Sequence, residues 1–512
     1  MAHWADEIAN QVLARSRKHL ISTGISPSGE IHIGNLREVV TADAIYRVLL
    51  ERDAEVEFHY IADNFDPLRR VYPFLDDQVY RPLVGRPLSE IPCPCGAHPS
   101  YSEHFLLPFL KTLDELWIRV QVFRADQLYK SGRMNPVIVA ALKGTEQIAS
   151  ILQELTGKQV EEGWSPFNPL CPVCGRINRA RLTGFDATRE TIDFACECGE
   201  SGTLPMAGGG KLTWRIDWPA RWEVFGVTVE PFGKDHASRG GSYDTGTRIV
   251  REVFGGEPPF PVPYEWISLK GRGDMSSSKG NVLSITRMLE VVPPEVLRYL
   301  IVRTRPLRSI PFDPGLPLLS LVDEYDDLES TSRDERALAL SRAGGGGSLG
   351  VPFRHLVNVV QIAGGDVEET ARILERNGYG NLDRALLSRR LEHAKRWLEE
   401  FAPAEMRFCV QETLPPSAAS LDKEQKAFLA ELAARLAAGM DAETVHKTIY
   451  TAAATVPQRK PAQLFEAIYI ALLGQPRGPR AGWFLTFLGL DFSARRFREA
   501  AGISEPEPAS GR

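Results

Sequence analysis

The chain has 512 residues, 43% of them hydrophobic and 25% charged, and its formal net charge at pH 7 is −6. A chain of this length predicts about two to four domains with sizeable cores. The acidic total argues against a basic protein that packages DNA, although local basic patches can still recognise one nucleic acid. Neither a signal-peptide core nor an apolar run that could span a membrane is present. We expect a cytoplasmic monomer with no membrane or DNA partner.

The first strong pattern is a strand, a turn and a helix between residues 20 and 52. Residues 20–23 are a short buried-type strand, and apolar residues recur at helical spacing from Leu36 onward. The turn at 24–35 is rich in Pro, Ser and Gly, and it presents backbone N–H groups and the positive end of the helix dipole, which suits a phosphate. It matches neither the Gly-rich dinucleotide fingerprint nor the Walker lysine pattern.

A second strand at 56–62 ends at Asp63, Asn64 and Asp66. Strand, helix and strand at this spacing predict an α/β fold with a parallel, doubly wound sheet, in which ligands bind beyond the carboxyl ends of the strands. We therefore expect Asp63 and Asp66 near a ligand site. A solvated acidic loop is the alternative interpretation.

Residues 82–206 form a predicted insertion, with helices at 104–117 and 136–155 and a strand at 120–123. The chain has seven cysteines, and without a secretion signal these favour metal ligation over disulfides. Two Cys pairs, each closed by a Gly, supply four thiolates for a tetrahedral structural zinc ribbon with no open coordination position. These ligands are Cys171, Cys174, Cys196 and Cys198.

A second predicted metal site lies earlier in the insertion. Two thiolates and two imidazoles would complete another closed zinc site. The four residues are Cys93, Cys95, His98 and His104. The alternative is a reduced loop in which His104 simply lies near a helix start.

The chain then returns to the sheet. Alternation at 212–218 predicts a strand, 220–225 a short helical turn, and 227–230 a strand followed by Asp235 and His236. An Asp after such a strand commonly accepts hydrogen bonds from ribose hydroxyls. We assign Asp235 to ribose and His236 to the adenosine pocket, with packing as the alternative for His236. Residues 264–270 are the last predicted strand, and the Ser- and Gly-rich loop after it carries Lys279, which can reach phosphate oxygens.

Two short motifs carry a resemblance to a known family. His32-Ile33-Gly34-Asn35 and Asp274-Met275-Ser276-Ser277-Ser278-Lys279 stand about 240 residues apart and resemble, in this order, the two signatures of class I aminoacyl-tRNA synthetases. Further strings at 213–218, 233–236 and 240–242 resemble the class I (archaeal-type) lysyl-tRNA synthetases. The resemblance implies a Rossmann-type parallel-sheet catalytic domain with a zinc-containing insertion, followed by an all-α helical C-terminal domain.

The domains that the resemblance implies follow the chain. They are the first half of the Rossmann catalytic domain at 1–81, the connective insertion with the zinc ribbon at 82–206, the second half of the catalytic domain at 207–265, a signature-loop and stem-contact region at 266–317, and a helical anticodon-binding domain at 318–512. Amphipathic runs in the last part are typical of a helical bundle. Basic and aromatic side chains there are candidate tRNA contacts or a solvated helix face. They are Arg389, Arg390, His393, Lys395, Arg396 and Trp397, and then Arg495, Arg496 and Arg498.

The function that the resemblance implies is that of a lysine–tRNA ligase. Such an enzyme activates lysine with Mg²⁺-bound ATP to lysyl-adenylate and transfers it to the 3′-terminal adenosine of tRNA(Lys). The implied catalytic residues are His32, Asn35 and Lys279, which orient and stabilise phosphate charge. The implied ATP-binding residues are Pro27, Gly29, Gly34, Asp235, His236, Met275, Ser277 and Ser278.

The sequence departs from the family pattern at two places. Asp274 stands where the second signature usually begins with Lys, so an acid would repel ATP phosphates unless it points away or meets Mg²⁺. In the earlier cluster, Cys93 stands at the family's Asp position and Ala97 at its Cys position, and Cys95 can replace that thiol.

Lysine as a substrate needs an acid for its ammonium group and an apolar or aromatic wall for its methylenes. The sequence offers several candidates and does not choose among them. They are Trp218, Tyr243 and Trp266 for the wall, and Asp217, Asp244 or Glu265 for the charge.

Three alternatives remain open. A class I glutamate-type synthetase would share the signatures but would need a pocket arginine. A non-aminoacylating tRNA-binding paralogue, which Asp274 makes conceivable, would bind tRNA and show no ATP–pyrophosphate exchange with any amino acid. A small-molecule nucleotidyltransferase also uses this fold, but it would not need a long helical C-terminal half.

Overall fold

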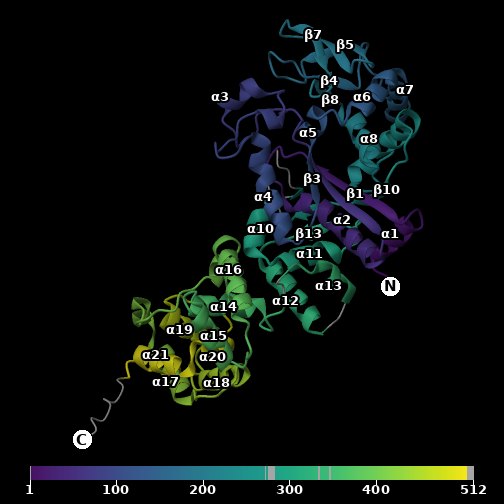
Figure 1. The fold of residues 1–512 in the computed structure, drawn as a ribbon. Helices are drawn as coiled ribbons and strands as arrows, with labels where there is room; N and C mark the ends of the chain where they lie inside the picture. The colour runs from purple at the N-terminus through teal and green to yellow at the C-terminus, as the bar shows by residue number, and fades with distance from the viewer. Residues whose placement is uncertain (1, 271–272, 275–282, 332–334, 345–346, 504–512) are drawn as a thin grey trace. The chain divides into compact units, whose positions relative to one another are not determined.

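The computed structural model describes residues 2–270, 273–274, 283–331, 335–344 and 347–503 (Figure 1). The chain divides into two compact units. Unit 1 comprises Met1–Leu289, Pro294–Phe312 and Asp334–Gly345, and unit 2 comprises Glu290–Pro293, Asp313–Arg333 and Gly346–Arg512. None of the helices in the described part of the chain is both long enough and apolar enough to cross a membrane.

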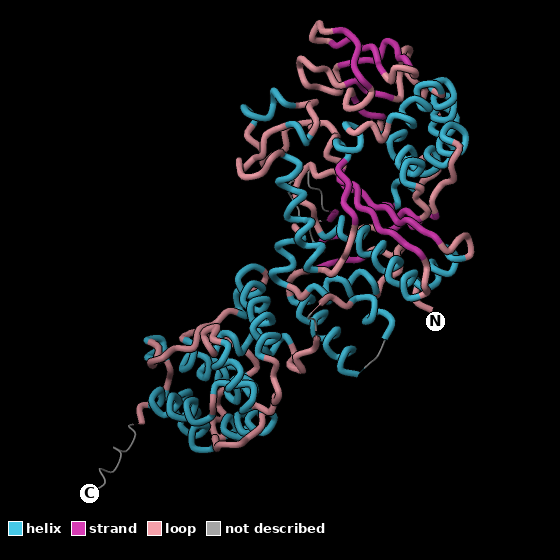
Figure 2. Tube along the Cα trace, in the orientation of Figure 1, coloured by secondary structure: helices cyan, strands magenta, loops and turns pink. Residues whose placement is uncertain are grey.

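A five-stranded parallel sheet in the order β10-β9-β1-β2-β3 forms the centre of unit 1 (Figure 2). This confirms the predicted α/β parallel-sheet fold. Strand β3 comes from within residues 82–206 and forms one edge of the sheet, where His59 to Ala62 of β2 pair with Gln121 to Arg124. The strands are β1 (Lys18–Ile25), β2 (Glu55–Ala62), β3 (Gln121–Arg124), β9 (Val229–Gly233) and β10 (Phe260–Tyr264).

Helix α2 (Ile33–Glu51) packs on β1, β2 and β9 and against α1 (Trp4–Leu13) and α11 (Pro294–Val302). Its residue Arg37 is 1% exposed, and its guanidinium donates hydrogen bonds to the carbonyls of Pro306 at 2.9 Å and Arg308 at 2.5 Å. A buried cation needs such partners, because leaving water without them is costly. Arg37 therefore joins the first crossover helix to the chain that follows α11.

Two predicted strands differ from the structure. Of the first, 212–218, only Leu212 lies in a strand, as the last residue of β8 (Gly210–Leu212), and α8 (Trp214–Phe225) begins two residues later. The alternation was misleading because Trp214, Trp218 and Trp222 recur every four residues and stack along one helix face, with ring centroids 5.6 and 4.9 Å apart. The second predicted strand, 264–270, contains β11 (Ile267–Leu269), which belongs to a separate three-stranded sheet with β12 (Gly273–Asp274) and β13 (Ile310–Phe312).

The insertion consists of helices and an antiparallel ribbon. The ribbon strands are β5 (Ala180–Asp186), β6 (Thr191–Cys196) and β7 (Ser201–Pro205), and β4 (Phe167–Pro169) pairs with β8. Its helices are α4 (Tyr101–Glu115), α5 (Ala125–Lys130), α6 (Asn135–Lys143) and α7 (Thr145–Thr156). Helix α3 (Asp77–Tyr80) precedes it, and α9 (Ser242–Ile249) packs against α8.

The described part of unit 2 contains helices and loops and no strand, as predicted for an all-α domain. Its helices are α12 (Leu316–Thr331), α14 (Phe353–Ile362), α15 (Val367–Arg376), α16 (Arg384–Glu400), α17 (Lys423–Arg435), α18 (Ala442–Ala454), α19 (Pro461–Leu473), α20 (Ala481–Leu488) and α21 (Leu490–Ala501). Helix α13 (Glu335–Ser341) belongs to unit 1, and α10 (Ile285–Val291) lies where the chain passes between the units.

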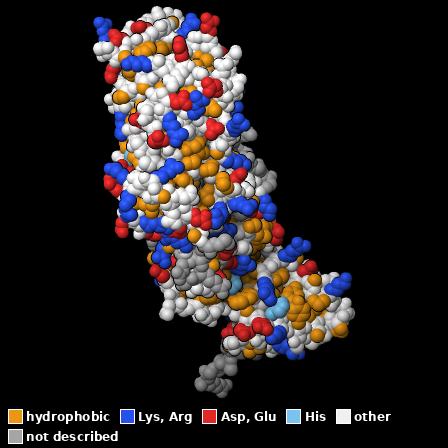
Figure 3. Space-filling model, turned by 90° about the vertical axis from the view of Figure 1, so that its right-hand side faces the viewer, with side chains coloured by type: hydrophobic (Ala, Val, Ile, Leu, Met, Phe, Trp, Pro, Cys, Tyr) orange, Lys and Arg blue, Asp and Glu red, His pale blue; other side chains and the backbone are white. Residues whose placement is uncertain are grey.

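Three of the predicted tRNA contacts serve the interior of unit 2. Arg390 is 1% exposed and pairs with Asp326 at 2.9 Å, and the indole N–H of the fully buried Trp397 donates to the Pro314 carbonyl. Arg496 donates to the carbonyls of residues 411–413. These three side chains are structural, so that prediction was wrong for them. On the face drawn in Figure 3, basic and acidic side chains are interspersed, with no continuous basic coat.

Candidate active site and metal centres

The first signature forms the turn between β1 and α2. His32 caps the helix: its ring Nδ1 accepts the Gly34 N–H at 3.1 Å, and its backbone N–H donates to Asn35 Oδ1 at 3.2 Å. Burial lowers the pKa of His32 to about 4, so the imidazole is neutral near pH 7. Because Nδ1 is an acceptor, the ring proton sits on Nε2. That N–H makes no hydrogen bond within the described residues and is available to a ligand oxygen.

Two contacts from other segments fix the turn. The Ser26 hydroxyl donates to Asp66 Oδ2 at 2.8 Å, and the Tyr101 hydroxyl donates to the Ser28 carbonyl at 2.7 Å. Of the predicted ATP-binding residues, Pro27 lies between Ser26 and Ser28, and Gly29 follows Ser28; both are buried. The turn is therefore held from β2 on one side and from α4 on the other.

The second signature is described only at its ends. Met275, Ser277, Ser278 and Lys279 lie outside the described residues. Beyond them, the Leu283 carbonyl accepts the Ile33 N–H at 3.3 Å, and the Ile285 N–H donates to the Ile31 carbonyl at 3.3 Å. An antiparallel bridge joins His32 and Ser284. The chain that leaves the second signature is thus bonded to the first.

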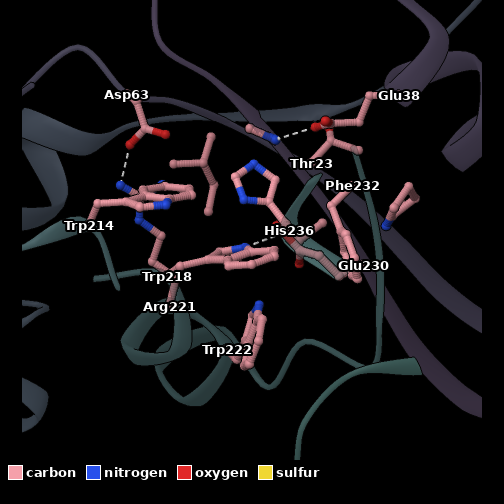
Figure 4. Close-up of a pocket in the computed structure, with 14 residues that line it drawn as sticks. Thr23, Glu38, Asp63, Trp214, Trp218, Arg221, Trp222, Glu230, Phe232 and His236 are labelled. Atoms are coloured by element: carbon pink, nitrogen blue, oxygen red, sulfur yellow. Dashed lines mark hydrogen bonds and ion pairs between the residues drawn. The ribbon is translucent and has the colours of Figure 1, made fainter. Parts of the chain in front are cut away.

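A pocket with about 450 Å³ of empty space opens at the carboxyl edge of the sheet (Figure 4). Strands β1, β2 and β9 end at it, as expected for a doubly wound sheet. The predicted residues Asp63, Trp218 and His236 line it. Its other labelled walls are Thr23, Glu38, Trp214, Arg221, Trp222, Glu230 and Phe232.

The other predicted lysine-binding residues lie outside this lining. Asp217 is fully buried and accepts the Tyr129 hydroxyl proton at 2.6 Å. Tyr243 stacks on the Phe232 wall at 4.9 Å, and its hydroxyl donates to the Pro259 carbonyl. Trp266 is 37% exposed. Asp235, predicted for ribose, keeps a half-exposed side chain beside His236.

Two acidic side chains of the pocket went unnoticed in the sequence. The Trp218 indole N–H donates to Glu230 Oε1 at 2.8 Å, while the buried Oε2 has no partner among the described residues. Burial raises the pKa of Glu230 well above its usual value. Burial also raises the pKa of Glu38 to about 7, although its carboxylate accepts the Gly24 N–H and the Tyr264 hydroxyl proton. Glu230 is the only acid in strand β9, which is the signal that could have identified it.

A network of buried charges lies under the pocket. Arg221 bonds to both Asp63 and Asp217, and Lys211 bonds to Asp66 and lies 3.3 Å from Asp217. All five side chains are at most 17% exposed. The one arginine that lines the pocket is therefore already paired with two carboxylates.

Both predicted metal clusters are assembled. In each, one ligand atom per residue lies within 4.8 Å of the others. The sulfurs of Cys171 and Cys198 are 3.6 Å apart, and those of Cys174 and Cys196 are 3.7 Å apart. These separations match the edge of a tetrahedron with zinc–sulfur bonds of about 2.3 Å, which is about 3.7 Å.

The other cluster also fits zinc. The Cys93 and Cys95 sulfurs are 3.3 Å apart, and the Nδ1 atoms of His98 and His104 lie 3.3–3.5 Å from them. Two thiolates and two imidazoles at these separations form a closed, tetrahedral donor set, so Cys95 supplies the fourth ligand although Ala97 stands at the family's Cys position.

Comparison with known proteins assigns the family. A model described as tRNA synthetases class I (K) matches residues 2–342, and one described as an anticodon binding domain matches residues 381–501. The chain belongs to the class I tRNA synthetases of the K type. It is 52% identical to a lysine–tRNA ligase of Methanosarcina barkeri, over 98% of each chain. It is 50% identical to the lysine–tRNA ligase of Archaeoglobus fulgidus, over 97% of this chain and 100% of that one.

The two clusters predict the metal content of the protein. Zinc analysis should give about two ions per chain, and Cys198→Ser should lower this to about one because a ribbon thiolate is lost. Cys409→Ser is the matched control, since Cys409 is exposed and belongs to neither cluster. A zinc content that Cys198→Ser leaves unchanged would contradict the ribbon assignment.

Proposed function

We propose that this chain is a lysine–tRNA ligase that forms lysyl-adenylate from lysine and ATP and passes the lysyl group to tRNA(Lys). In the first step, a lysine carboxylate oxygen bonds to the α-phosphorus of ATP as the bond to pyrophosphate breaks. In the second, a hydroxyl of the terminal adenosine attacks the lysyl carbonyl and AMP leaves. The pocket beside the signature turn, which is lined by carboxyl groups and aromatic rings, is the observation that carries the proposal.

The charge of the pocket favours a cationic amino acid. Glu38, Glu230 and Asp63 bring three carboxyl groups, while Arg221 is held by Asp63 and Asp217. The unpartnered Glu230 Oε2 gains a partner from an ammonium group, which also favours its ionised form. The rings of Trp218, Trp222 and Phe232 pack together and offer a wall for methylenes. A glutamate substrate would instead add a fourth carboxylate and find no unpaired arginine in this lining.

The phosphates of ATP, with Mg²⁺, belong on the other side of the site. The neutral His32 supplies an Nε2–H donor, Asn35 fixes its orientation, and Lys279 supplies positive charge from the second signature. Pro27, Gly29 and Gly34 shape the turn around the phosphates, and Asp235 and His236 take the adenosine. We further propose Met275, Ser277 and Ser278 as ATP contacts and residues 381–501 as the part that reads the anticodon.

The function is tested by ATP–pyrophosphate exchange with each of the twenty amino acids. We expect exchange with lysine and with no other amino acid at comparable concentration, because only lysine matches both the carboxylates and the aromatic wall. Exchange that depends on glutamate would identify the sister activity. Tight tRNA binding with no exchange at all would identify a non-aminoacylating paralogue.

His32 can be tested in the same assay. His32→Ala removes one preorganised donor, so the lysine-dependent exchange rate should fall by roughly 10²-fold or more. The thermal unfolding midpoint serves as the control for loss of the helix cap, which costs about 1 kcal/mol. An unchanged exchange rate would remove His32 from the mechanism.

Glu38 gives lysine capture a pH dependence. Since its pKa is about 7 in the free protein, the carboxyl holds a proton below that pH, and a bound ammonium has to displace the proton. The KM for lysine should therefore rise as the pH falls from about 8 to about 6, approaching tenfold per pH unit at the acid end. Glu38→Gln should raise the KM and flatten this profile. A wild-type KM that is constant over this range would exclude Glu38 from lysine binding.

A further inference from the structure

The Cys93–His104 cluster lies close in sequence to a contact with the ATP-binding turn. We propose that Tyr101 transmits the occupancy of this metal site to the turn, so that zinc bound by Cys93, Cys95, His98 and His104 tightens ATP binding. The inference rests on the proposed placement of ATP at residues 26–35. It assigns Tyr101 as a positioning residue, since it acts through the turn.

The metal ligands are built onto both sides of Tyr101. Cys93, Cys95 and His98 lie in a loop whose neck is the hydrogen bond from the Tyr101 N–H to the Ile91 carbonyl, 2.9 Å long. His104 lies three residues after Tyr101 in the first turn of α4, which Ser100 caps. A metal that binds all four ligands therefore cross-links the loop to the helix turn that carries Tyr101.

The Tyr101 side chain reaches from this helix turn to the signature turn. The residue is fully buried, and its ring packs against those of Tyr80 and Phe105 at 5.9 and 5.1 Å. Its hydroxyl donates to the Ser28 carbonyl at 2.7 Å. Burial raises the pKa of Tyr101 far above its usual value, so the hydroxyl remains a donor at every working pH.

Metal binding by the cluster is expected to affect the stability of the ATP-binding turn. The small core around Tyr101 contains no described strand. Tyr101 and Phe105 belong to α4 and the other residues come from short helices and loops, so a bound metal adds a cross-link between the loop and α4. Without the metal, the loop and the helix turn are joined only by hydrogen bonds and packing. One of the two anchors of the turn then loosens, while Ser26 and Asp66 retain the other.

The test is a cycle of four proteins in which the dissociation constant of ATP is measured by calorimetry. They are the wild type, Tyr101→Phe, the cluster variant Cys95→Ala/His98→Ala, and the triple variant. Loss of one hydrogen bond corresponds to a roughly three- to tenfold weaker binding of ATP, which we expect for Tyr101→Phe and for the cluster variant alike. The triple variant should bind ATP no more weakly than either. Zinc analysis should show one ion lost from the cluster variant and none from Tyr101→Phe.

Tyr80→Phe is the matched control. Tyr80 lies in the same small core, but its hydroxyl donates to the Pro92 carbonyl at 3.0 Å and makes no contact with the turn. With zinc bound, this variant should bind ATP as the wild type does. An equal loss of ATP affinity in Tyr80→Phe would show that any weakening of the core has the same effect, which would overturn the role of Tyr101.

A second measurement requires no cluster variant. Linkage is reciprocal, so saturating ATP should tighten zinc binding by the same factor in the wild type and leave it unchanged in Tyr101→Phe. Competition with a chromophoric chelator measures this affinity. Additive effects in the cycle, or an equal response of both proteins to ATP, would overturn the inference. Failure of lysine-dependent exchange in the wild type, with the coupling intact, would reject the proposed function and leave the inference standing.

Discussion

Backbone hydrogen bonds between residues 31–33 and residues 283–285 join two segments that are about 250 positions apart in the chain. The rest of the site depends on this join. It places the end of the second signature loop against the turn that opens α2, and α2 in turn lies on β1, β2 and β9. Because loop closure over such a distance has an entropic cost, these hydrogen bonds need further contacts to stabilise the join. Arg37 contributes by binding backbone carbonyls that follow α11.

The second constraint is the removal of water from charged groups. Five ionisable side chains under the pocket, two cations and three carboxylates, pair with one another, and two glutamates beside them have raised pKa values because burial disfavours their charge. A pocket built in this way is poised to accept positive charge, since a cation relieves a penalty that the free protein already bears. In the proposed function, selectivity for lysine follows from this charge balance together with the aromatic wall.

Local chemistry made part of the site predictable. Eight Cys and His ligands were assigned from residue type and spacing, and the structure brings both sets together because knuckle turns are short-range features. His32 was assigned from the resemblance of residues 32–35 to a family signature, and the structure places it as the N-cap of α2, which begins at Ile33. The burial of a side chain, in contrast, depends on residues that are far away in the sequence. Glu38 and Glu230 look like ordinary residues of a helix and a strand until β9 and α8 enclose them.

Residues 212–218 also show that a local pattern cannot replace knowledge of the neighbouring elements. A run with alternating apolar residues and Trp at every fourth position satisfies both a strand and a helix pattern, and only its neighbours decide. In the helix, Asp217 points about 100° away from Trp218, since consecutive residues are separated by that angle. It therefore bonds to Tyr129 and Arg221 and does not line the pocket.

The neutral state of His32 has a consequence for an organism whose internal acidity fluctuates. In the proposed function, an imidazole that stays uncharged down to a pKa of about 4 would donate to a phosphate equally well in a resting and in an acid-stressed cell. Acidification would instead raise the KM for lysine through Glu38 in the pocket. A cell with ample ATP would then charge its tRNA more slowly until its lysine concentration rose.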